Sequence, residues 1–193
     1  MPPITLTAAS MDLSPAVDRR DNVSSDEAAL QATVLGLFDA HAAGLRRYAL
    51  SFGLPPSAAE DVVQEAYLTL FAHLRLGRPR EHLKGWLYRV THNLSLKQRQ
   101  RAKRWQHADA DAARALVLID PADNPEERLA GAERRRRLRA VTQALAERDR
   151  RCLYLRAEGL NYRDIARVLG VSLGSVAKSL TRAFARLASS EAR

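Results

Sequence analysis

The sequence predicts an all-α protein made of two small helical domains joined by a flexible linker, the C-terminal one carrying a helix-turn-helix. Three observations lead to this fold class. Apolar residues recur at helical spacing through most of the chain, and no segment shows the strict alternation of a β-strand. Of the 193 residues, 46% are hydrophobic and 27% are charged, so the chain can bury real cores.

The charge and the cysteine content indicate which kind of binding partner and which cellular compartment the protein is suited to. The chain has 31 Lys and Arg against 22 Asp and Glu, a formal net charge of +9, which indicates a nucleic acid or an anionic membrane surface as partner. The single Cys152 excludes an internal disulfide and a zinc site built from cysteines, as in a reducing cytoplasm. Without a membrane-length apolar run or a secretory signal pattern, the sequence predicts a soluble, cytoplasmic protein.

The first domain is expected over residues 26–105. Residues 1–25 have no apolar period and are predicted to be a flexible extension. An amphipathic helix follows from Asp26 to the break at Gly53-Leu54-Pro55-Pro56, and a capping box at Ser57-Ala58-Ala59-Glu60 opens a second helix. A third helix is expected after the break at Gly77–Arg80. The residues expected inward on the three helices are Leu30, Val34, Leu37, Phe38, His41, Leu45, Tyr48 and Phe52, then Val62, Val63, Ala66, Leu70, Phe71 and Leu74, then Leu83, Trp86, Leu87, Val90 and Leu94.

The second domain is expected over residues 125–190, after a linker at residues 106–124 that is rich in Ala and Asp. Pro125-Glu126-Glu127 is a favourable first helical turn, and that helix continues to Leu145. Further helices are predicted over residues 148–158, 161–169 and 172–187.

The last two of these helices have the spacing of a helix-turn-helix. Ala166 is small where two helices cross, and Gly170 stands where the tight turn needs a positive φ. Asn161 and Ser172 are placed to cap the two helices. The residues expected to seal the core are Ile165, Leu169, Val171, Val176 and Leu180.

On a helical wheel the final helix turns a cationic face outward. Leu173, Phe184 and Leu187 join its inward side, and the outward side holds Lys178, Thr181, Arg182 and Ala185. Long cations beside small hydroxyl residues suit the major groove of DNA, whereas the plain alternative is a helical hairpin with a solvated face.

Two further surfaces carry interpretable patterns. The third helix interleaves aromatic and basic residues on the face opposite its apolar side, a composition that suits single-stranded nucleic acid; these residues are Tyr88, Arg89, His92, Ser95 and Arg99. For Trp86 we favour a place in the core. On the second helix, Asp61, Gln64 and Glu65 are neighbours, and spacing alone leaves open whether they only add solubility or form a docking patch for a basic partner.

Three segments together resemble the sigma factors of bacterial RNA polymerase, of the compact extracytoplasmic-function (ECF) type within the sigma-70 family. Residues 59–71, AEDVVQEAYLTLF, resemble the polymerase-binding helix of region 2. Residues 85–96, GWLYRVTHNLSL, resemble its promoter-melting helix. Residues 145–148 and 155–166 with the helix-turn-helix resemble region 4, so the likeness spans roughly residues 30–187.

The resemblance implies roles for named residues. Asp61, Gln64 and Glu65 would dock core RNA polymerase. The loop at residues 77–84 and the following helix would open and hold the minus-ten promoter element through Arg78, Arg80, Lys84, Tyr88, Arg89, His92 and Arg99. The minus-thirty-five element would be read by Ser172, Ser175, Lys178, Thr181 and Arg182. The implied partners are core RNA polymerase, promoter DNA and an anti-sigma factor.

Other readings have less support. The histidines are scattered and no nucleophile–base pair or phosphate-binding glycine loop is present, so we expect neither an enzyme nor a cofactor. His107, Asp109 and Asp111 could ligate a metal, but an acidic linker with no metal is the favoured interpretation. Cys152 is read as a core thiol. The main alternative is a stand-alone helix-turn-helix regulator that binds DNA without polymerase, and a basic helix on a membrane surface is a third.

Overall fold

The protein is helical throughout the part that the computed structural model describes, residues 17–105 and 136–191. Helices α1 (Val17–Leu50), α2 (Pro56–Arg75) and α3 (Leu83–Trp105) form the N-terminal domain. Residues 136–144 are also helical and are followed by α5 (Glu147–Ala157), α6 (Tyr162–Leu169) and α7 (Leu173–Glu191). The predicted all-α class is confirmed, while the linker at residues 106–124 lies outside the described residues.

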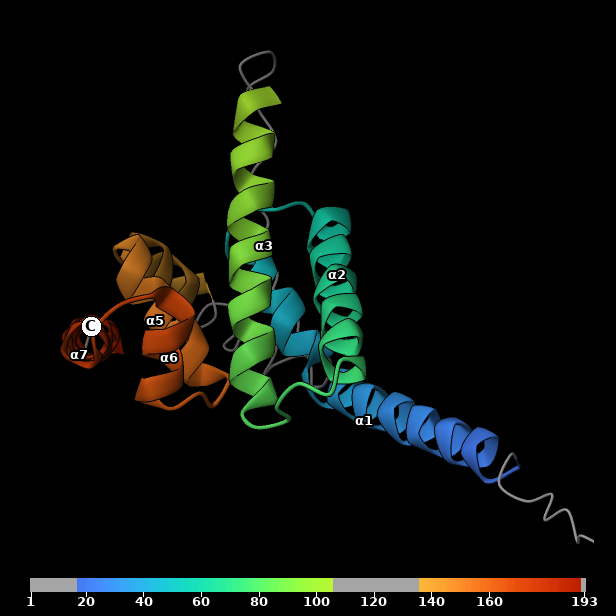
Figure 1. The fold of residues 1–193 in the computed structure, drawn as a ribbon. Helices are drawn as coiled ribbons and strands as arrows, with labels where there is room; N and C mark the ends of the chain where they lie inside the picture. The colour runs from blue at the N-terminus through green and yellow to red at the C-terminus, as the bar shows by residue number, and fades with distance from the viewer. Residues whose placement is uncertain (1–16, 106–135, 192–193) are drawn as a thin grey trace, which may run out of the picture.

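The N-terminal domain is a three-helix bundle in which α2 and the second half of α1 pack beside α3 (Figure 1). The α2 helix buries a stripe at helical spacing that includes Val62, Ala66 and Leu70. The Tyr67 hydroxyl donates to the Leu37 carbonyl oxygen at 2.8 Å, which fixes α2 against α1. The upper part of α3 rises beyond its neighbours, and the N-terminal part of α1 extends away from the bundle.

Two expectations about helix starts differ from the structure. The α1 helix begins at Val17, inside the segment expected to be a flexible extension. The predicted capping box is wrong, because Pro55 is the N-cap of α2 and no side chain caps it. Proline at the first helical turn needs no hydrogen-bond acceptor for its nitrogen, and Glu60 instead pairs with Arg46 of α1 at 2.9 Å.

The C-terminal domain packs on the side of α3 away from α2, with α6 against α3 (Figure 1). One continuous apolar cluster contains Leu45 and Leu87 from the first domain and Leu155 and Ile165 from the second. The two domains are therefore docked on each other. Of the described helices, none offers the long apolar stretch that crossing a lipid bilayer requires.

Candidate functional site

The helix-turn-helix is present with the predicted local geometry. Asn161 caps α6, since the Asp164 backbone N–H donates to Asn161 Oδ1 at 2.9 Å. Gly170 ends α6 in the left-handed region with φ 64°, and the Ser175 backbone N–H donates to Ser172 Oγ at 3.2 Å. Both caps and the glycine turn are confirmed. Ile165, Val176 and Leu180 are fully buried, as expected for the core of this motif.

The outward face of α7 carries most of the predicted contacts with duplex DNA. Lys178, Thr181 and Arg182 are exposed, and Lys178 makes no ion pair with any described residue. The Thr181 hydroxyl donates to the Ala177 carbonyl oxygen at 3.0 Å. The exposed ammonium of Lys178 is therefore free to reach a phosphate or a base.

The Arg182 side chain is held in place by a buried carboxylate. Its Nε and Nη2 donate to the two Asp149 oxygens at 2.9 and 2.7 Å, although the arginine is exposed and Asp149 is buried. These hydrogen bonds lower the pKa of Asp149. The guanidinium is thereby orientated on the helix surface before any DNA arrives.

The predicted orientation of α7 is wrong for two large apolar side chains. Leu173 and Phe184 were expected inward, yet both are 48% exposed. The buried face instead includes Ser179 and Ala183, which are 0% exposed. Small residues let α5 approach α7 closely, so the packed face is rotated away from the one that hydrophobicity alone selects.

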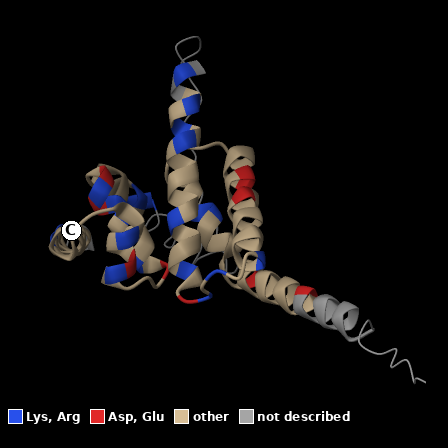
Figure 2. Cartoon of the chain, in the orientation of Figure 1, with Lys and Arg blue, Asp and Glu red and all other residues tan. Residues whose placement is uncertain are grey.

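The acidic patch on α2 is exposed as predicted. Asp61, Gln64 and Glu65 face solvent, while Val62 and Ala66 between them are buried. Figure 2 shows acidic residues on α2 and basic residues along α3. Within this one domain, negative charge therefore gathers on α2 and positive charge on α3.

Sequence reasoning missed Leu68 in this patch. Leu68 follows Gln64 by one helical turn and is 71% exposed. A leucine on an amphipathic helix is normally assigned to the core, so hydrophobicity alone does not indicate that Leu68 is exposed. A helical wheel centred on Asp61 and Glu65 would have found it, since Leu68 lies seven residues after Asp61 on the same face.

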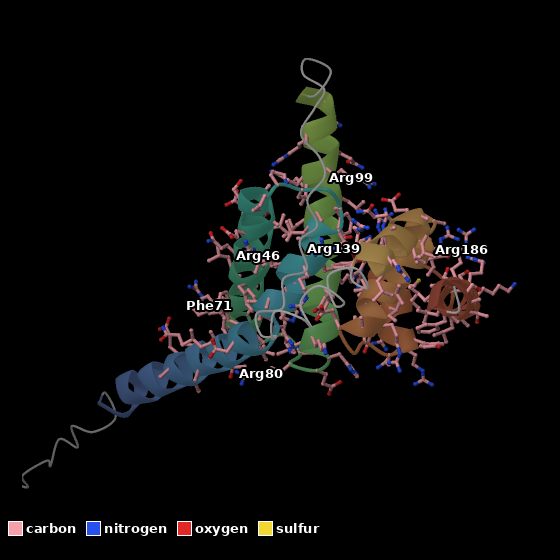
Figure 3. All side chains as sticks on the ribbon, turned by 180° about the vertical axis from the view of Figure 1, so that it is seen from behind. Arg46, Phe71, Arg80, Arg99, Arg139 and Arg186 are labelled. Carbon is pink, nitrogen blue, oxygen red and sulfur yellow. The ribbon has the colours of Figure 1, made fainter. Side chains whose placement is uncertain are left out.

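The residues predicted for the minus-ten element divide into two groups. Arg78, Arg80 and Arg89 are exposed, on the loop before α3 and on α3 itself, and Figure 3 labels Arg80 there. In this loop His82 adopts a positive φ of 55°, a strained conformation for a residue with a side chain. These three arginines are available to a nucleic-acid backbone.

The second group contradicts the expectation of a solvent-facing surface. Tyr88, His92 and Ser95 are 1%, 5% and 0% exposed. The Tyr88 hydroxyl donates to Glu158 Oε2 at 3.1 Å, and Tyr48 Oη lies 2.8 Å from His92 Nδ1. Burial, together with Glu158, raises the pKa of Tyr88. The physical reason for the difference is that α1 and the docked C-terminal domain cover this face.

Lys84 and Arg99 also meet the C-terminal domain. Lys84 Nζ lies 3.3 Å from the position that a Cβ on Gly159 would occupy. Arg99 Nη1 donates to Glu147 Oε1 at the start of α5, and Figure 3 labels Arg99 on α3. Tyr88 and Arg99 thus bond to the other domain directly, and Lys84 lies beside it.

Two remaining predictions concern metals and the thiol. Cys152 is 0% exposed, and burial raises its pKa, so it is the core thiol that was expected. The candidate ligands His107, Asp109 and Asp111 lie outside the described residues. Within residues 17–105 and 136–191 no cluster of three or more metal-ligating side chains occurs.

Comparisons with known proteins agree on one family. Residues 37–105 match the sequence family Sigma-70 region 2, and residues 135–187 match Sigma-70, region 4. The ECF RNA polymerase sigma factor SigL of Mycobacterium tuberculosis is 31% identical over 163 residues, which are 82% of this chain and 88% of that protein. The ECF RNA polymerase sigma factor EcfG of Rhodopseudomonas palustris is 28% identical over 145 residues, 74% and 76% of the two chains.

Solved structures share the fold. The sigma factor RpoE from Bartonella quintana, in complex with the anti-sigma factor NepR, matches with a TM-score of 0.58 and 23% identity over 90% of this chain and 96% of that one. CnrH, in complex with the cytosolic domain of CnrY, matches with a TM-score of 0.54 and 24% identity over 88% and 94%. With both regions matched in order and a relative aligned over most of both lengths, this chain belongs to the sigma-70 family as an ECF sigma factor that directs transcription by RNA polymerase.

Proposed function

We propose that this sigma factor divides promoter recognition between its two domains. Helix α7 reads the minus-thirty-five element, and the loop before α3, with α3 itself, opens and holds the minus-ten element. The observation that carries this proposal is the exposed cationic face of α7, where Lys178 is unpaired among described residues and Arg182 is orientated by Asp149. A rigid helix with preset donors suits duplex DNA, which presents its base edges in a fixed groove.

The exposed arginines before α3 support the second half of the proposal. Arg78 and Arg80 lie on an irregular loop, where the backbone can follow a distorted strand, and Arg89 follows on α3. Guanidinium groups at these positions can neutralise phosphates of an unpaired strand and stack on its bases.

The polymerase is proposed to dock on α2. Asp61, Gln64 and Glu65 form a compact acidic surface, and Leu68 adds an exposed apolar side chain at its edge. Specific protein interfaces combine charged groups that orientate the partner with apolar side chains that the partner buries, and this surface offers both. Because such a partner works on DNA, we place the protein's action in the bacterial cytoplasm.

Charge reversal tests the docking surface. The variant Asp61→Lys/Glu65→Lys should keep its helix content, because both side chains are exposed and Lys favours helix as Glu does. We expect it to lose co-purification with bacterial core RNA polymerase and run-off transcription. The matched control Glu27→Lys/Asp39→Lys reverses two exposed acids on α1 and should retain both. Equal loss in the two variants would assign the effect to net charge and contradict the docking surface.

A second experiment separates the two promoter elements. Lys178→Ala/Arg182→Ala should weaken binding to duplex promoter and leave transcription from a pre-melted template largely intact. Arg78→Ala/Arg80→Ala should spare duplex recognition and impair strand opening, a defect relieved by an artificial bubble. Permanganate footprinting of the two holoenzymes on duplex and bubble templates distinguishes these outcomes. If both variants failed at the same step, the division of labour would be wrong.

An anti-sigma factor is included among the proposed partners. Both solved relatives named above are complexes, one of them with an anti-sigma factor by name. The exposed apolar side chains Leu68, Leu173 and Phe184 offer anchors for such a protein. Co-expression of the chain with candidate inhibitors, followed by run-off transcription, tests this partner.

A further inference from the structure

The loop between α2 and α3, residues 76–82, is bonded to His73 in the last turn of α2. This loop joins the lower ends of the two helices in Figure 1 and carries Arg78 and Arg80. His73 meets it twice, once through its backbone carbonyl and once through its imidazole ring. The conformation of the loop therefore depends on a residue of the preceding helix.

The backbone contact belongs to a glycine turn that closes α2. The Gly77 N–H donates to the Leu74 carbonyl oxygen at 3.0 Å, and the Arg78 N–H donates to the His73 carbonyl oxygen at 3.4 Å. Gly77 itself lies in the left-handed region, with φ 66°. Two such bonds around a left-handed residue form a Schellman motif, which ends many helices. The backbone is thus fixed as far as Arg78.

The imidazole of His73 extends this arrangement into the loop. Its Nε2 lies 3.2 Å from the Pro79 carbonyl oxygen, and since a carbonyl oxygen only accepts, Nε2 carries the proton and donates. The Pro79 ring restricts its own φ and also the backbone of Arg78 before it. His73 therefore bonds to both ends of the Arg78-Pro79 dipeptide, to the N–H of the first residue and the carbonyl of the second.

The His73 ring is placed in turn by Trp86 on α3. Both side chains are half-buried, and their ring centroids are 4.8 Å apart with an interplanar angle of 40°. Aromatic rings at this separation attract each other beyond the area that they bury. The Trp86 backbone N–H also donates to the carbonyl oxygen of His82, the last loop residue, at 3.0 Å. The two helices that flank the loop therefore both take part in fixing it.

We propose that His73 is a positioning residue for promoter opening: its bond to Pro79 holds the loop in one conformation, from which Arg78 is presented to the opened strand. The inference rests on the proposed function, in which Arg78 binds that strand. Arg78 is exposed and makes no ion pair with any described residue, so its place is set by its backbone. A loop that is already ordered loses less conformational entropy when the strand binds.

Two substitutions of His73 separate the hydrogen-bond donor from the ring. His73→Phe keeps a ring beside Trp86 and removes the donor, whereas His73→Gln removes the ring and keeps an N–H donor at a similar reach. Phe and Gln form helix at least about as well as His, so both variants should keep the helix content of the wild type in circular dichroism. Ala72→Gln is the matched control, because it adds the same side chain at an exposed position one residue away.

Trypsin cleavage of the full chain measures the loop without DNA or polymerase. The Arg80–Glu81 bond lies in the loop, and its rate of cleavage follows the population of molecules in which the loop is open. Loss of one hydrogen bond at an exposed site should make His73→Phe about two- to tenfold faster to cut than the wild type. His73→Gln and Ala72→Gln should be cut at the wild-type rate. Equal rates for His73→Phe and the wild type would overturn the positioning role.

Promoter opening tests whether the held loop matters to the strand. On a duplex promoter, holoenzyme with His73→Phe should give about two- to tenfold less permanganate reactivity than wild type, and His73→Gln or an artificial bubble should restore it. In an Arg78→Ala/Arg80→Ala background His73→Phe should add nothing, because the loop then has no guanidinium to present. A further loss of the same size in that background would contradict the proposal, since His73 would then act through structure alone.

The proposed function and this inference fail in different ways. If Arg78→Ala/Arg80→Ala opened the duplex promoter as well as the wild type does, the loop would not hold the strand, and the proposed function would fail together with the role of His73 in opening. The trypsin result would still report whether His73 fixes the loop. If that variant lost opening while His73→Phe opened the promoter normally, the proposed function would stand and the positioning role would be wrong.

Discussion

Two glycines of α1 should respond in opposite ways to the same substitution. Gly36 has no atom within 4 Å of an added Cβ, so Gly36→Ala should stabilise the protein by about 0.5–1 kcal/mol through helix propensity alone. At Gly44 the added Cβ would lie 2.5 Å from Tyr88 Oη and also contact the Glu158 carboxylate. Overpacking of this kind costs about 1–3 kcal/mol, which exceeds the propensity gain.

We therefore expect Gly44→Ala to lower the free energy of unfolding by about 1–2 kcal/mol in urea denaturation. The destabilisation caused by Gly44→Ala should be smaller in a Glu158→Ala background, because the second substitution removes the carboxylate that the added Cβ would contact. Thermal unfolding gives a second reading, at about 2–4 °C per kcal/mol for a chain of this size. If Gly44→Ala stabilised the protein as much as Gly36→Ala does, Glu158 would not lie over α1, and the reasoning would be refuted.

Three further predictions concern stability in urea titrations. Burial, with two nearby arginine cations, lowers the pKa of His92 from 6.5 to about 4, so the unfolded chain binds more protons between these values. Stability should therefore fall as the pH falls from 6.5 to 4, by up to about 1.4 kcal/mol per pH unit, and His92→Gln should flatten this part of the profile. Gly170→Ala should cost about 1 kcal/mol because φ is 64°, whereas Gly174→Ala in α7 should stabilise; the same sign for both would contradict the turn geometry. Asn161→Ala should cost about 0.5–2 kcal/mol and Asn161→Asp much less, since only the latter keeps an acceptor for the α6 cap.

The helix-turn-helix could be predicted from the sequence because its determinants are local. An N-cap acts on the backbone three residues away, and Gly170 acts on the turn that contains it. Each requirement can be checked within one or two helical turns. The acidic patch on α2 was predictable for a similar reason, since Asp61, Gln64 and Glu65 are placed by a single amphipathic helix.

The burial of Tyr88 and His92 could not be predicted in this way, because their covering groups are distant in sequence. Glu158 contacts Tyr88 across 70 residues, and Tyr48 contacts His92 across 44. A stripe of aromatic and basic residues suits both a nucleic acid and a polar domain interface, so composition cannot distinguish them. The sequence does carry one signal for this burial. From Gly85 to Arg99 these residues are spaced alternately by three and four, which is typical of a helix face that packs against another helix, and the small Gly85 stands at one end of that face.

The interface between the two domains combines polar and apolar contacts. Hydrogen bonds across it join Glu158 to Tyr88 and Arg47, and Glu147 to Arg99, and every one of these groups can bond water after separation. Each such bond therefore contributes only about 0.5–3 kcal/mol to docking. The Ser95 hydroxyl, 0% exposed and without a hydrogen-bond partner among the described residues, would gain one from water if undocking exposed it. These four hydrogen bonds together contribute on the order of 2–12 kcal/mol, and the apolar cluster that Leu87 shares with Leu155 and Ile165 adds to the docking energy. Polar and apolar contacts therefore hold the C-terminal domain against α3 together, and neither kind alone accounts for the docking.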